Sequence, residues 1–243
     1  MLRSAHGLFG HTISARDGEI GKVHNFLFDD QLWIVRYLVA ETGGWLSSRR
    51  VLISPLAFGQ PDWEQRLLPV SLSKDQVRDS PDVDTDKPVS RQQEILMNRY
   101  YGWPYYWTVE PFPVSVGFTA PSIDPTPPEQ PLGDPHLRSV REVIGYHILA
   151  SDGEIGHVRD FIVEDRTWAV SYMVVDTGDW LPGKEVLVTP QRIDAVSWEQ
   201  RQVVVALSRD RIQRSPGYDP SAPVNRGYEI RLYDYYGRPH KEP

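Results

Sequence analysis

Short runs of β-branched and aromatic residues recur along the chain, separated by glycine, aspartate and proline. The run at 33–41, Trp-Ile-Val-Arg-Tyr-Leu-Val-Ala-Glu, predicts a central strand, because such residues pack well on a pleated surface. Thr-Gly-Gly at 42–44 predicts the turn that follows, and the runs at 51–54 and 67–72 predict two more strands. The pattern therefore indicates a small unit that is mainly β.

Asp17-Gly18 lies between two apolar runs, at about 8–14 and about 20–29. An Asp-Gly pair in this setting predicts a β-hairpin with a type I′ turn, since both residues tolerate the positive φ angles that this turn needs. Gly21, inside the second run, predicts a β-bulge or a close approach of two backbones.

The same pattern returns 135 residues later (152 − 17 = 135) and needs no gap from Gly10/Gly145 to Pro104/Pro239. Landmarks that keep this spacing are Asp17/Asp152, Gly21/Gly156, Trp33/Trp168, Tyr37/Tyr172, Trp45/Trp180, Pro55/Pro190, Trp63/Trp198 and Tyr100/Tyr235. The chain is therefore a tandem duplication. We expect two similar units, which together form a pseudo-dimer within one chain.

Signals for two short helices follow each set of predicted strands. Ser73 has the position of an N-cap for the first helix, and the stretch at 88–97 predicts a second helix that stops at Gly102. Asn225 and Gly237 take the same cap and stop positions in the second copy. We expect each unit to be a set of strands followed by these helices.

Prolines concentrate between the copies, at 111, 113, 121, 125, 127, 128, 131 and 135. Such a segment favours an extended conformation and cannot build a core. The sequence therefore predicts a first domain at 1–107, a Pro-rich linker at 108–138 and a second domain at 139–243.

The duplicated motif resembles the PRC-barrel family. The residues that carry the resemblance are Asp17-Gly18-Glu19-Ile20-Gly21-Lys22-Val23, Trp33, Tyr37 and Thr42-Gly43-Gly44-Trp45-Leu46, with their counterparts in the second copy. The match covers about 7–72 and about 143–207. The segments behind it resemble the C-terminal extension of stand-alone bacterial PRC-barrel proteins, through Ser80-Pro81, Pro88-Val89, Arg91, Glu94 and Tyr100-Tyr101-Gly102.

The resemblance implies a mainly β fold of two tandem small PRC-type β-barrels, each followed by short helices and joined by the Pro-rich linker. It also implies a non-enzymatic protein–protein interaction or assembly module that binds a protein partner. Two alternatives stay open. One is a peripheral accessory protein of a membrane electron-transfer complex, by likeness to the photosynthetic reaction-centre H subunit. The other is an adaptor in ribosome assembly or RNA processing, by likeness to the C-terminal domain of the ribosome maturation factor.

Composition narrows these choices. The formal net charge of −7 and the absence of a dense Lys/Arg cluster argue against direct nucleic-acid binding, which needs cations to replace the counterions of phosphates. No apolar run reaches the 18 residues of a candidate membrane helix, so no integral membrane segment is predicted. The chain has no cysteine, which fits a reducing cytoplasm. We expect a cytoplasmic protein, with a peripheral membrane location as the alternative.

Polar residues do not assemble into a recognisable catalytic or metal-binding motif. The carboxylates near Asp17 and Asp152 are interpreted as turn and strand-end residues. The series at Asp82, Asp84 and Asp86 lacks the glycine and glutamate that an EF-hand loop requires at its sixth and twelfth positions. The seven histidines contain no i, i+4 pair on a predicted helix. We predict no enzyme activity, no catalytic residue, no cofactor and no metal.

Aromatic residues are the candidates for an interaction surface. Trp45 and Trp180 follow predicted turns and are expected either to plug a barrel end or to lie on a contact surface. The run after the second helix contributes Trp103, Tyr105, Tyr106 and Trp107. Tyrosine and tryptophan give large contact areas at low entropy cost, which favours a binding role. Two alternatives stay open for this run: packing back on its own unit, or contact with the linker or the other copy.

Overall fold

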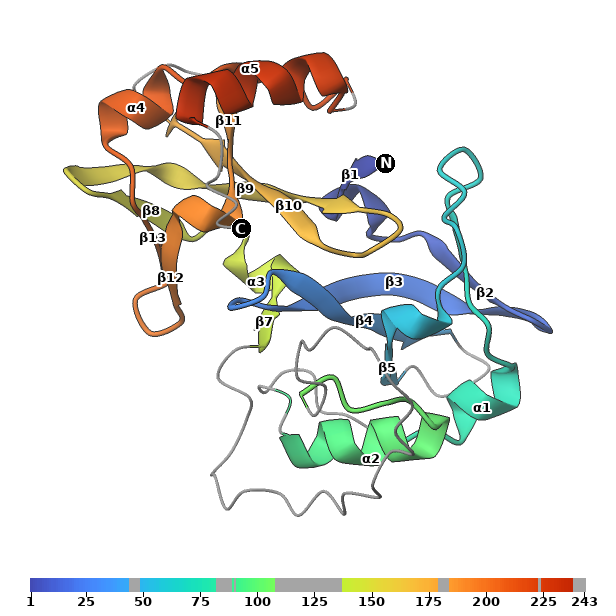
Figure 1. The fold of residues 1–243 in the computed structure, drawn as a ribbon. Coiled ribbons are helices and arrows are strands. Elements are labelled where there is room, and N and C mark those ends of the chain that lie inside the picture. The colour runs from blue at the N-terminus through green and yellow to red at the C-terminus, as the bar shows by residue number, and fades with distance from the viewer. Residues whose placement is uncertain are drawn as a thin grey trace, which may run out of the picture.

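The structure, a computed structural model, describes residues 1–43, 49–81, 89, 91–107, 137–178, 184–222 and 224–237. Within these residues the chain is mainly β and forms two sheets, one built largely from each copy of the duplication. We name the copies repeat one (residues 1–107) and repeat two (residues 137–243). Figure 1 shows the two sheets packed between helix α5 (Arg226–Tyr236) on one side and helix α2 (Arg91–Tyr101) on the other.

The sheet of repeat one has the strand order β5-β4-β3-β2-β6, and β7 pairs with β3 outside this path. The bounds are β2 (Thr12–Ala15), β3 (Gly18–Asp29), β4 (Ile34–Thr42), β5 (Arg50–Ile53), β6 (Leu67–Pro69) and β7 (Leu137–Ser139). The sheet is antiparallel except for the parallel pair of β2 and β6.

The sheet of repeat two has the order β12-β13-β8-β9-β10-β11-β14, and β1 pairs with β9. The bounds are β1 (Leu2–Ser4), β8 (His147–Ala150), β9 (Gly153–Glu164), β10 (Val170–Asp176), β11 (Glu185–Val188), β12 (Ile193–Ser197), β13 (Gln202–Val205) and β14 (Gly217–Tyr218). Here too one pair is parallel, β8 with β13, at the place equivalent to β2 and β6.

The helices are short. The described α-helices besides α2 and α5 are α1 (Lys74–Arg78), α3 (Val140–Val143) and α4 (Arg209–Gln213), and single 3₁₀ turns form at η1 (His6–Leu8), η3 (Pro55–Ala57) and η5 (Pro190–Arg192). The predicted caps are confirmed: the Ser73 side chain begins α1 in a capping box, and the Asn225 side chain accepts from the amide of Tyr228 at the start of α5. Among the described residues, no helix is both long and apolar enough to cross a membrane.

The two repeats exchange their first strands. β1 of repeat one pairs with the end of β9 in repeat two, and β7 of repeat two pairs with the end of β3 in repeat one. Both strands read Leu-Arg-Ser and are 135 residues apart, so the exchange is reciprocal. Of the predicted linker, residues 108–136 lie outside the described part of the chain, whereas Leu137 and Arg138 belong to β7. Each sheet therefore takes one strand from across the predicted domain boundary.

The repeats meet at equivalent residues. Ile34 and Ala169 form an antiparallel bridge. The amide of Val35 donates to the carbonyl of Trp168 at 2.9 Å, and the amide of Val170 donates to that of Trp33 at 2.7 Å. Because each bond has its counterpart, the contact has the two-fold character of an isologous interface.

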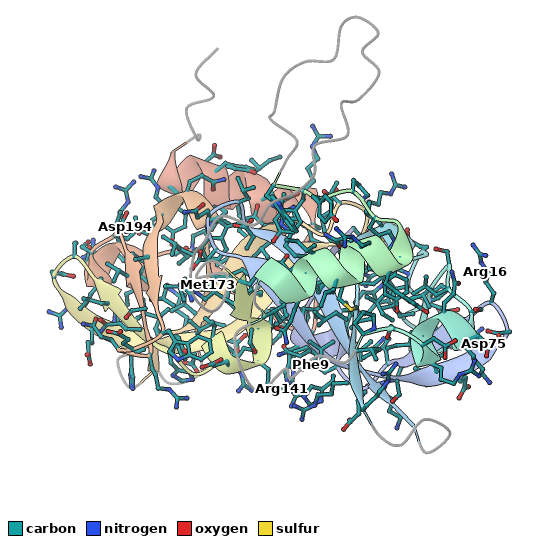
Figure 2. The ribbon with its side chains drawn as sticks, turned by 90° about the horizontal axis from the view of Figure 1, so that it is seen from below. Phe9, Arg16, Asp75, Arg141, Met173 and Asp194 are labelled. Atoms are coloured by element: carbon teal, nitrogen blue, oxygen red, sulfur yellow. The ribbon has the colours of Figure 1, made fainter. Side chains whose placement is uncertain are left out.

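The strand predicted over 33–41 forms, but Trp33 and its counterpart Trp168 lie just outside the strands and not within them. Trp33 and Trp168 stand before β4 and β10 with φ angles of 54° and 59°. Trp168 is buried and meets the ring of Phe26 across the repeats at 5.7 Å, while Trp33 is half-buried and meets Phe161 at 6.5 Å. They anchor the junction between the sheets instead of the centre of a strand. Figure 2 shows another contact across the repeats, in which Arg141 lies over the ring of Phe9 at 4.7 Å.

The Asp-Gly hairpin is confirmed, but its turn type is wrong. Ala15 pairs with Gly18, so the loop consists of Arg16 and Asp17, and Asp17 has no positive φ. The Asp17 side chain instead accepts from the amide of Lys74 at 2.8 Å, at the start of α1. This tertiary bond, which repeat two reproduces with Asp152, explains why an aspartate follows the strand.

The predicted bulge is confirmed at Gly21 and Gly156. The register of β2 and β3 shifts next to Gly21, and both glycines have positive φ. A Cβ atom would lie 2.1 Å from the carbonyl oxygen of Glu41 at Gly21, and 1.8 Å from that of Asp176 at Gly156. Only glycine fits such an approach. The mainly β class is thus confirmed, while the closure of each sheet into a PRC-type barrel remains a prediction.

Candidate functional site

The aromatic segment at 103–107 directly follows α2. That helix ends at Tyr101, and Gly102 turns the chain with a φ of 70°, as the sequence predicted. The Trp103 amide then donates to the carbonyl of Asn98 at 2.8 Å, and its ring stacks on Tyr101 with centroids 4.2 Å apart. The helix end therefore sends the segment back over the sheet of repeat one.

Tyr106 is the residue through which the segment is fixed. Its hydroxyl donates to the carboxyl group of Glu94 at 2.7 Å, and the hydroxyl of Tyr37 donates to the same oxygen at 2.9 Å. Glu94, on α2, and Tyr37, on β4, are almost fully buried. The carboxyl group thus links the helix, the sheet and the aromatic segment in one buried hydrogen-bond network.

A guanidinium group covers the other side of Tyr106. Arg36 on β4 lies over the tyrosine ring at 3.8 Å and forms an ion pair with Asp29 at 3.0 Å. A cation this close to an aromatic face contributes about 0.5–2 kcal/mol. Because Arg36 and Asp29 are both largely shielded from solvent, the ring is held in a defined place and not only against an apolar surface.

The predicted aromatic residues of this segment come together. The rings of Tyr105 and Tyr106 both meet Trp107, at centroid distances of 5.2 and 4.8 Å. Tyr106 also packs against a second, smaller core cluster, formed by Leu27, Tyr37, Val39, Leu52, Val89, Met97 and Leu137. The contacts of Tyr106 are thus mainly with its own repeat, and the cluster also contains Leu137 of the exchanged strand β7. Trp45 and Trp180 lie outside the described residues.

Burial shapes the titration of the network. It raises the pKa of the Tyr37 hydroxyl well above its ordinary value, and the neighbouring Glu94 and Tyr106 raise that pKa further. The phenol therefore remains a hydrogen-bond donor throughout the physiological pH range.

Repeat two has an equivalent tyrosine–glutamate pair, but a cavity lies where the aromatic segment packs in repeat one. Tyr172 donates to Glu229 at 3.2 Å, as Tyr37 does to Glu94. A cavity of about 580 Å³ opens beside this pair, between β10 and α5. Its lining includes Ser171, Tyr172, Arg192, Glu229, Leu232, Tyr233 and Tyr236. Glu229 is half-buried, in contrast to the fully buried Glu94, so the equivalent carboxyl group faces this cavity.

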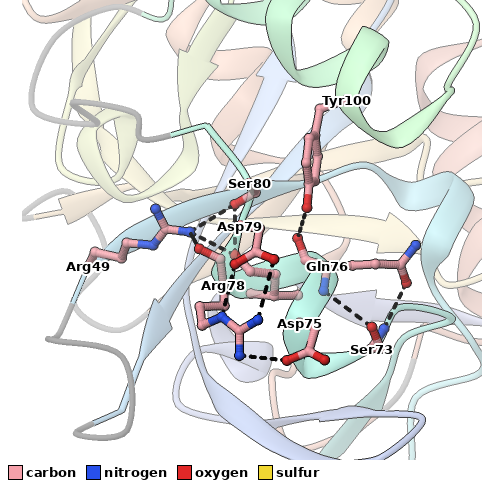
Figure 3. Close-up of polar contacts among 9 residues, drawn as sticks. Arg49, Ser73, Asp75, Gln76, Arg78, Asp79, Ser80 and Tyr100 are labelled. Carbon is pink, nitrogen blue, oxygen red and sulfur yellow. Dashed lines mark hydrogen bonds and ion pairs between the residues drawn. The ribbon is translucent and has the colours of Figure 1, made fainter.

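The Tyr-Tyr-Gly motif shared by the repeats has a structural role. The Tyr100 hydroxyl donates to the carbonyl of Gln76 in α1 at 2.9 Å, and that of Tyr235 donates to Arg211 in α4 at 2.8 Å. Figure 3 shows Tyr100 and Arg49 converging on α1, where Arg49 donates to the Val77 carbonyl at 2.8 Å. These contacts bind the small helix to its neighbours.

In the described part of the chain, the other candidate residues do not come together in an arrangement that would support metal binding. No group of three or more histidine, aspartate or glutamate side chains there could hold a metal ion. Asp82, Asp84 and Asp86 lie outside the described residues. Asp219, at the second position of the corresponding series in repeat two, accepts from the amide and the hydroxyl of Ser221, as in a local turn.

The sequence pointed to the aromatic segment but not to its partners. Arg36 belongs to no motif, and Glu94 was named only within the resemblance to the C-terminal extension, which assigns it no contact. The contacts of both residues depend on how α2 crosses the sheet. One signal was present: Tyr37 and Glu94 both recur at the repeat spacing, as Tyr172 and Glu229. A glutamate and a tyrosine that recur together on a predicted helix and a predicted strand are consistent with a pair that meets in both copies.

Comparison with known proteins adds little about function. No family model matches the chain. A protein of Deinococcus radiodurans, described only as uncharacterized, is 34% identical over 74 residues. The matched stretch covers 30% of this chain and 26% of that protein, so the chain spans about a quarter of the length of the relative it matches. The functional argument therefore depends on the geometry.

Proposed function

We propose that the chain is a non-enzymatic protein–protein interaction and assembly module, built from two PRC-barrel-like domains fused as a pseudo-dimer. The observation that supports this proposal is the pair of equivalent faces between the last helix and the sheet of each repeat. In repeat one, Glu94 and Arg36 hold an aromatic segment of the chain itself. In repeat two, the face around Glu229 is a cavity.

The fused arrangement suits a platform for assembly. The strand exchange and the bridge between Ile34 and Ala169 fix the two faces within one folded unit. The two faces are equivalent by duplication, but the aromatic segment covers one and a cavity lies at the other. The covered face can therefore stabilise the fold while the other face binds a partner. The net charge of −7 favours a protein partner over a nucleic acid.

The proposal is tested by capture of a partner. The tagged chain is incubated with lysate of its source organism, separated into membrane, ribosomal and remaining soluble fractions, then cross-linked and analysed by quantitative mass spectrometry. Excess untagged chain serves as competitor. We expect one or a few proteins whose recovery falls in the presence of the competitor. The fraction that contains them separates a general assembly role from the membrane and ribosomal alternatives. The absence of any competed protein in all three fractions would overturn the proposal.

A further inference from the structure

We propose that the cavity between β10 and α5 binds a partner segment that carries a tyrosine, whose hydroxyl donates to Glu229. This inference rests on the proposed function and specifies its ligand. It is derived from the duplication, because repeat one contains the occupied form of the same site.

The lining of the cavity corresponds to the surroundings of Tyr106. Tyr106 lies against Arg36, Glu94 and the cluster that contains Tyr37 and Met97. The residues at these positions in repeat two are Ser171, Glu229, Tyr172 and Leu232, and all four line the cavity. The cavity thus occupies the place that a tyrosine ring fills in repeat one.

Repeat two does not supply the ring at the corresponding positions of its own chain. The residues at 240–242, equivalent to Tyr105, Tyr106 and Trp107, are His, Lys and Glu. None carries a phenol. The phenol that already lines the cavity, Tyr233, is hydrogen-bonded to Tyr172. Under the proposal, the second hydroxyl donor to Glu229, equivalent to Tyr106, comes from another molecule.

The polar groups of the cavity complement a phenol. Among the residues that the structure describes, Glu229 accepts one bond, from the Tyr172 hydroxyl, at a length of 3.2 Å. Glu94 accepts two bonds on a single oxygen, which shows that a carboxyl group in this position serves two tyrosines. Ser171 stands at the position of Arg36, so repeat two lacks that cation. Arg192, which stands at the position of Ala57, lines the cavity instead. A ring in the cavity thus has a carboxyl acceptor and a guanidinium group beside it.

The surroundings favour an extended segment over a single small molecule. A second hollow of about 660 Å³ shares Val170, Pro190 and Gln191 with the first and continues to Asp30 and Trp33 at the junction of the repeats. The two hollows together form a groove with room for residues on either side of an anchoring tyrosine. In repeat one, the neighbouring Trp107 contacts the ring of Tyr106, and Tyr105 contacts Trp107.

The test uses a synthetic peptide with the sequence of residues 99–108 and the full chain. Binding is measured by fluorescence anisotropy of a labelled peptide, and the contact is located by NMR shifts of the isotope-labelled chain. We expect saturable binding with shifts centred on β10 and α5. A peptide with phenylalanine in place of all its tyrosines (Tyr100, Tyr101, Tyr105 and Tyr106) should bind at least tenfold more weakly, because it lacks any phenol donor to the Glu229 carboxyl group.

Variants of the chain assign the site. Glu229→Ala should weaken the peptide at least tenfold, whereas Glu199→Ala, a change to an exposed residue in the turn after β12, should leave its affinity unchanged. Circular dichroism and unfolding curves confirm that both variants are folded. Equal binding by Glu229→Ala and the parent chain, or no saturable binding of the peptide at all, would overturn the proposal. Equal affinity for N-acetyltyrosine amide would overturn its assignment to an extended segment.

Two further results separate this inference from the proposed function. If the chain self-associates and Glu229→Ala abolishes this association, the cavity is assigned to a second copy of the chain. That result would overturn the choice of a different partner. A competed protein that Glu229→Ala captures as well as the parent chain would overturn the cavity as its site, while the proposed assembly function would stand. Loss of that protein with Glu229→Ala, together with its displacement by the tyrosine peptide and not by the phenylalanine peptide, is the result we expect.

Discussion

Ile34 and Ala169 pair with each other in an antiparallel bridge, and they are the same position of the two repeats. A residue that meets its own counterpart lies on a two-fold axis, as in an isologous dimer. The exchanged strands reinforce this relationship. β8 and β1 pair with successive parts of β9, so the end of β9 would be an open edge without a strand from the other repeat. The two repeats therefore form one folded structure and not two independent domains joined by a linker.

The first prediction concerns this fusion. A specific protease site inserted within 108–136 and then cut should yield two fragments that stay together on size-exclusion chromatography. Each fragment keeps the strand that completes the other fragment's sheet, and the bonds between Val35 and Trp168 and between Val170 and Trp33 do not depend on the linker. The uncut insertion variant is the control. Separation of the fragments without denaturant would contradict the exchange.

The second prediction concerns the bulge glycines. Gly156→Ala should destabilise the fold by about 3 kcal/mol or more, since the new Cβ would collide with the Asp176 carbonyl. Gly145→Ala is the matched control. Gly145 also has positive φ, but no atom lies within 4 Å of a Cβ at that position, so we expect about 1–2 kcal/mol from the backbone alone. Urea unfolding measures both. Similar losses would show that the close approach is not what requires glycine.

Much of the fold could be predicted because its signals are local. The Asp-Gly hairpin, the bulge at Gly21, the cap at Ser73 and the stop at Gly102 all depend on residues within a few positions of each other. The duplication then carried each prediction into repeat two. The predicted turn type was wrong because the Asp17 side chain accepts a hydrogen bond from a distant group, the Lys74 amide. This contact, and not the φ preference of aspartate, decides its conformation.

What the sequence did not reveal depends on contacts between distant segments. Leu2–Ser4 and Leu137–Ser139 are too short to predict as strands, and only the sheets of the opposite repeats make them so. Their identity at the repeat spacing extends the duplication beyond Gly10 and Gly145, but it does not tell which sheet each strand joins. The same holds for the candidate site: Tyr106 was predicted, whereas Glu94 becomes its acceptor only once α2 packs on the sheet.

The third prediction compares the two carboxyl groups. Glu94→Ala should destabilise the chain by about 2–4 kcal/mol, because it leaves the buried hydroxyls of Tyr37 and Tyr106 without their acceptor. Glu229→Ala should cost about 1 kcal/mol or less, since Glu229 is half-buried and holds one tyrosine. Denaturant unfolding of both variants, monitored by circular dichroism, provides the measurement. Equal losses would indicate that the two faces are equally closed and would remove the basis for a binding role of repeat two.

The fourth prediction concerns acid stability. His11 is buried with its ring against Trp63, and burial together with the charge of Arg66 lowers its pKa below the ordinary 6.5. Between these two pKa values the unfolded chain binds a proton that the folded chain does not, so stability falls as the pH drops below about 6.5. His11→Phe should remove this part of the loss. The test is the free energy of unfolding from pH 8 to pH 5, where the difference between variant and parent should change. A constant difference would contradict the buried neutral histidine.

The fifth prediction uses repeat one to improve repeat two. Asp160 accepts hydrogen bonds from the amides of His6 and Phe161 and from the hydroxyl of Ser4, the last residue of the exchanged strand β1. Asn25 holds the equivalent position, accepting from the amides of Arg141 and Phe26 and donating to Ser139 at 2.7 Å. An asparagine therefore fits the same set of partners without a buried charge.

Burial raises the pKa of the Asp160 carboxyl group, and this effect outweighs that of its hydrogen bonds, which lower the pKa. A carboxyl group whose pKa is raised on folding makes the folded chain bind more protons, so stability falls as the pH rises through that window. Asp160→Asn should then stabilise the chain at pH 7, by about 0.5–1.5 kcal/mol, and the gain should shrink as the pH falls towards 3.8, the ordinary pKa of the group. Unfolding curves of the variant and the parent at a series of pH values measure this. A loss of stability at pH 7 would instead show that the charge strengthens the bonds to the exchanged strand by more than its burial costs.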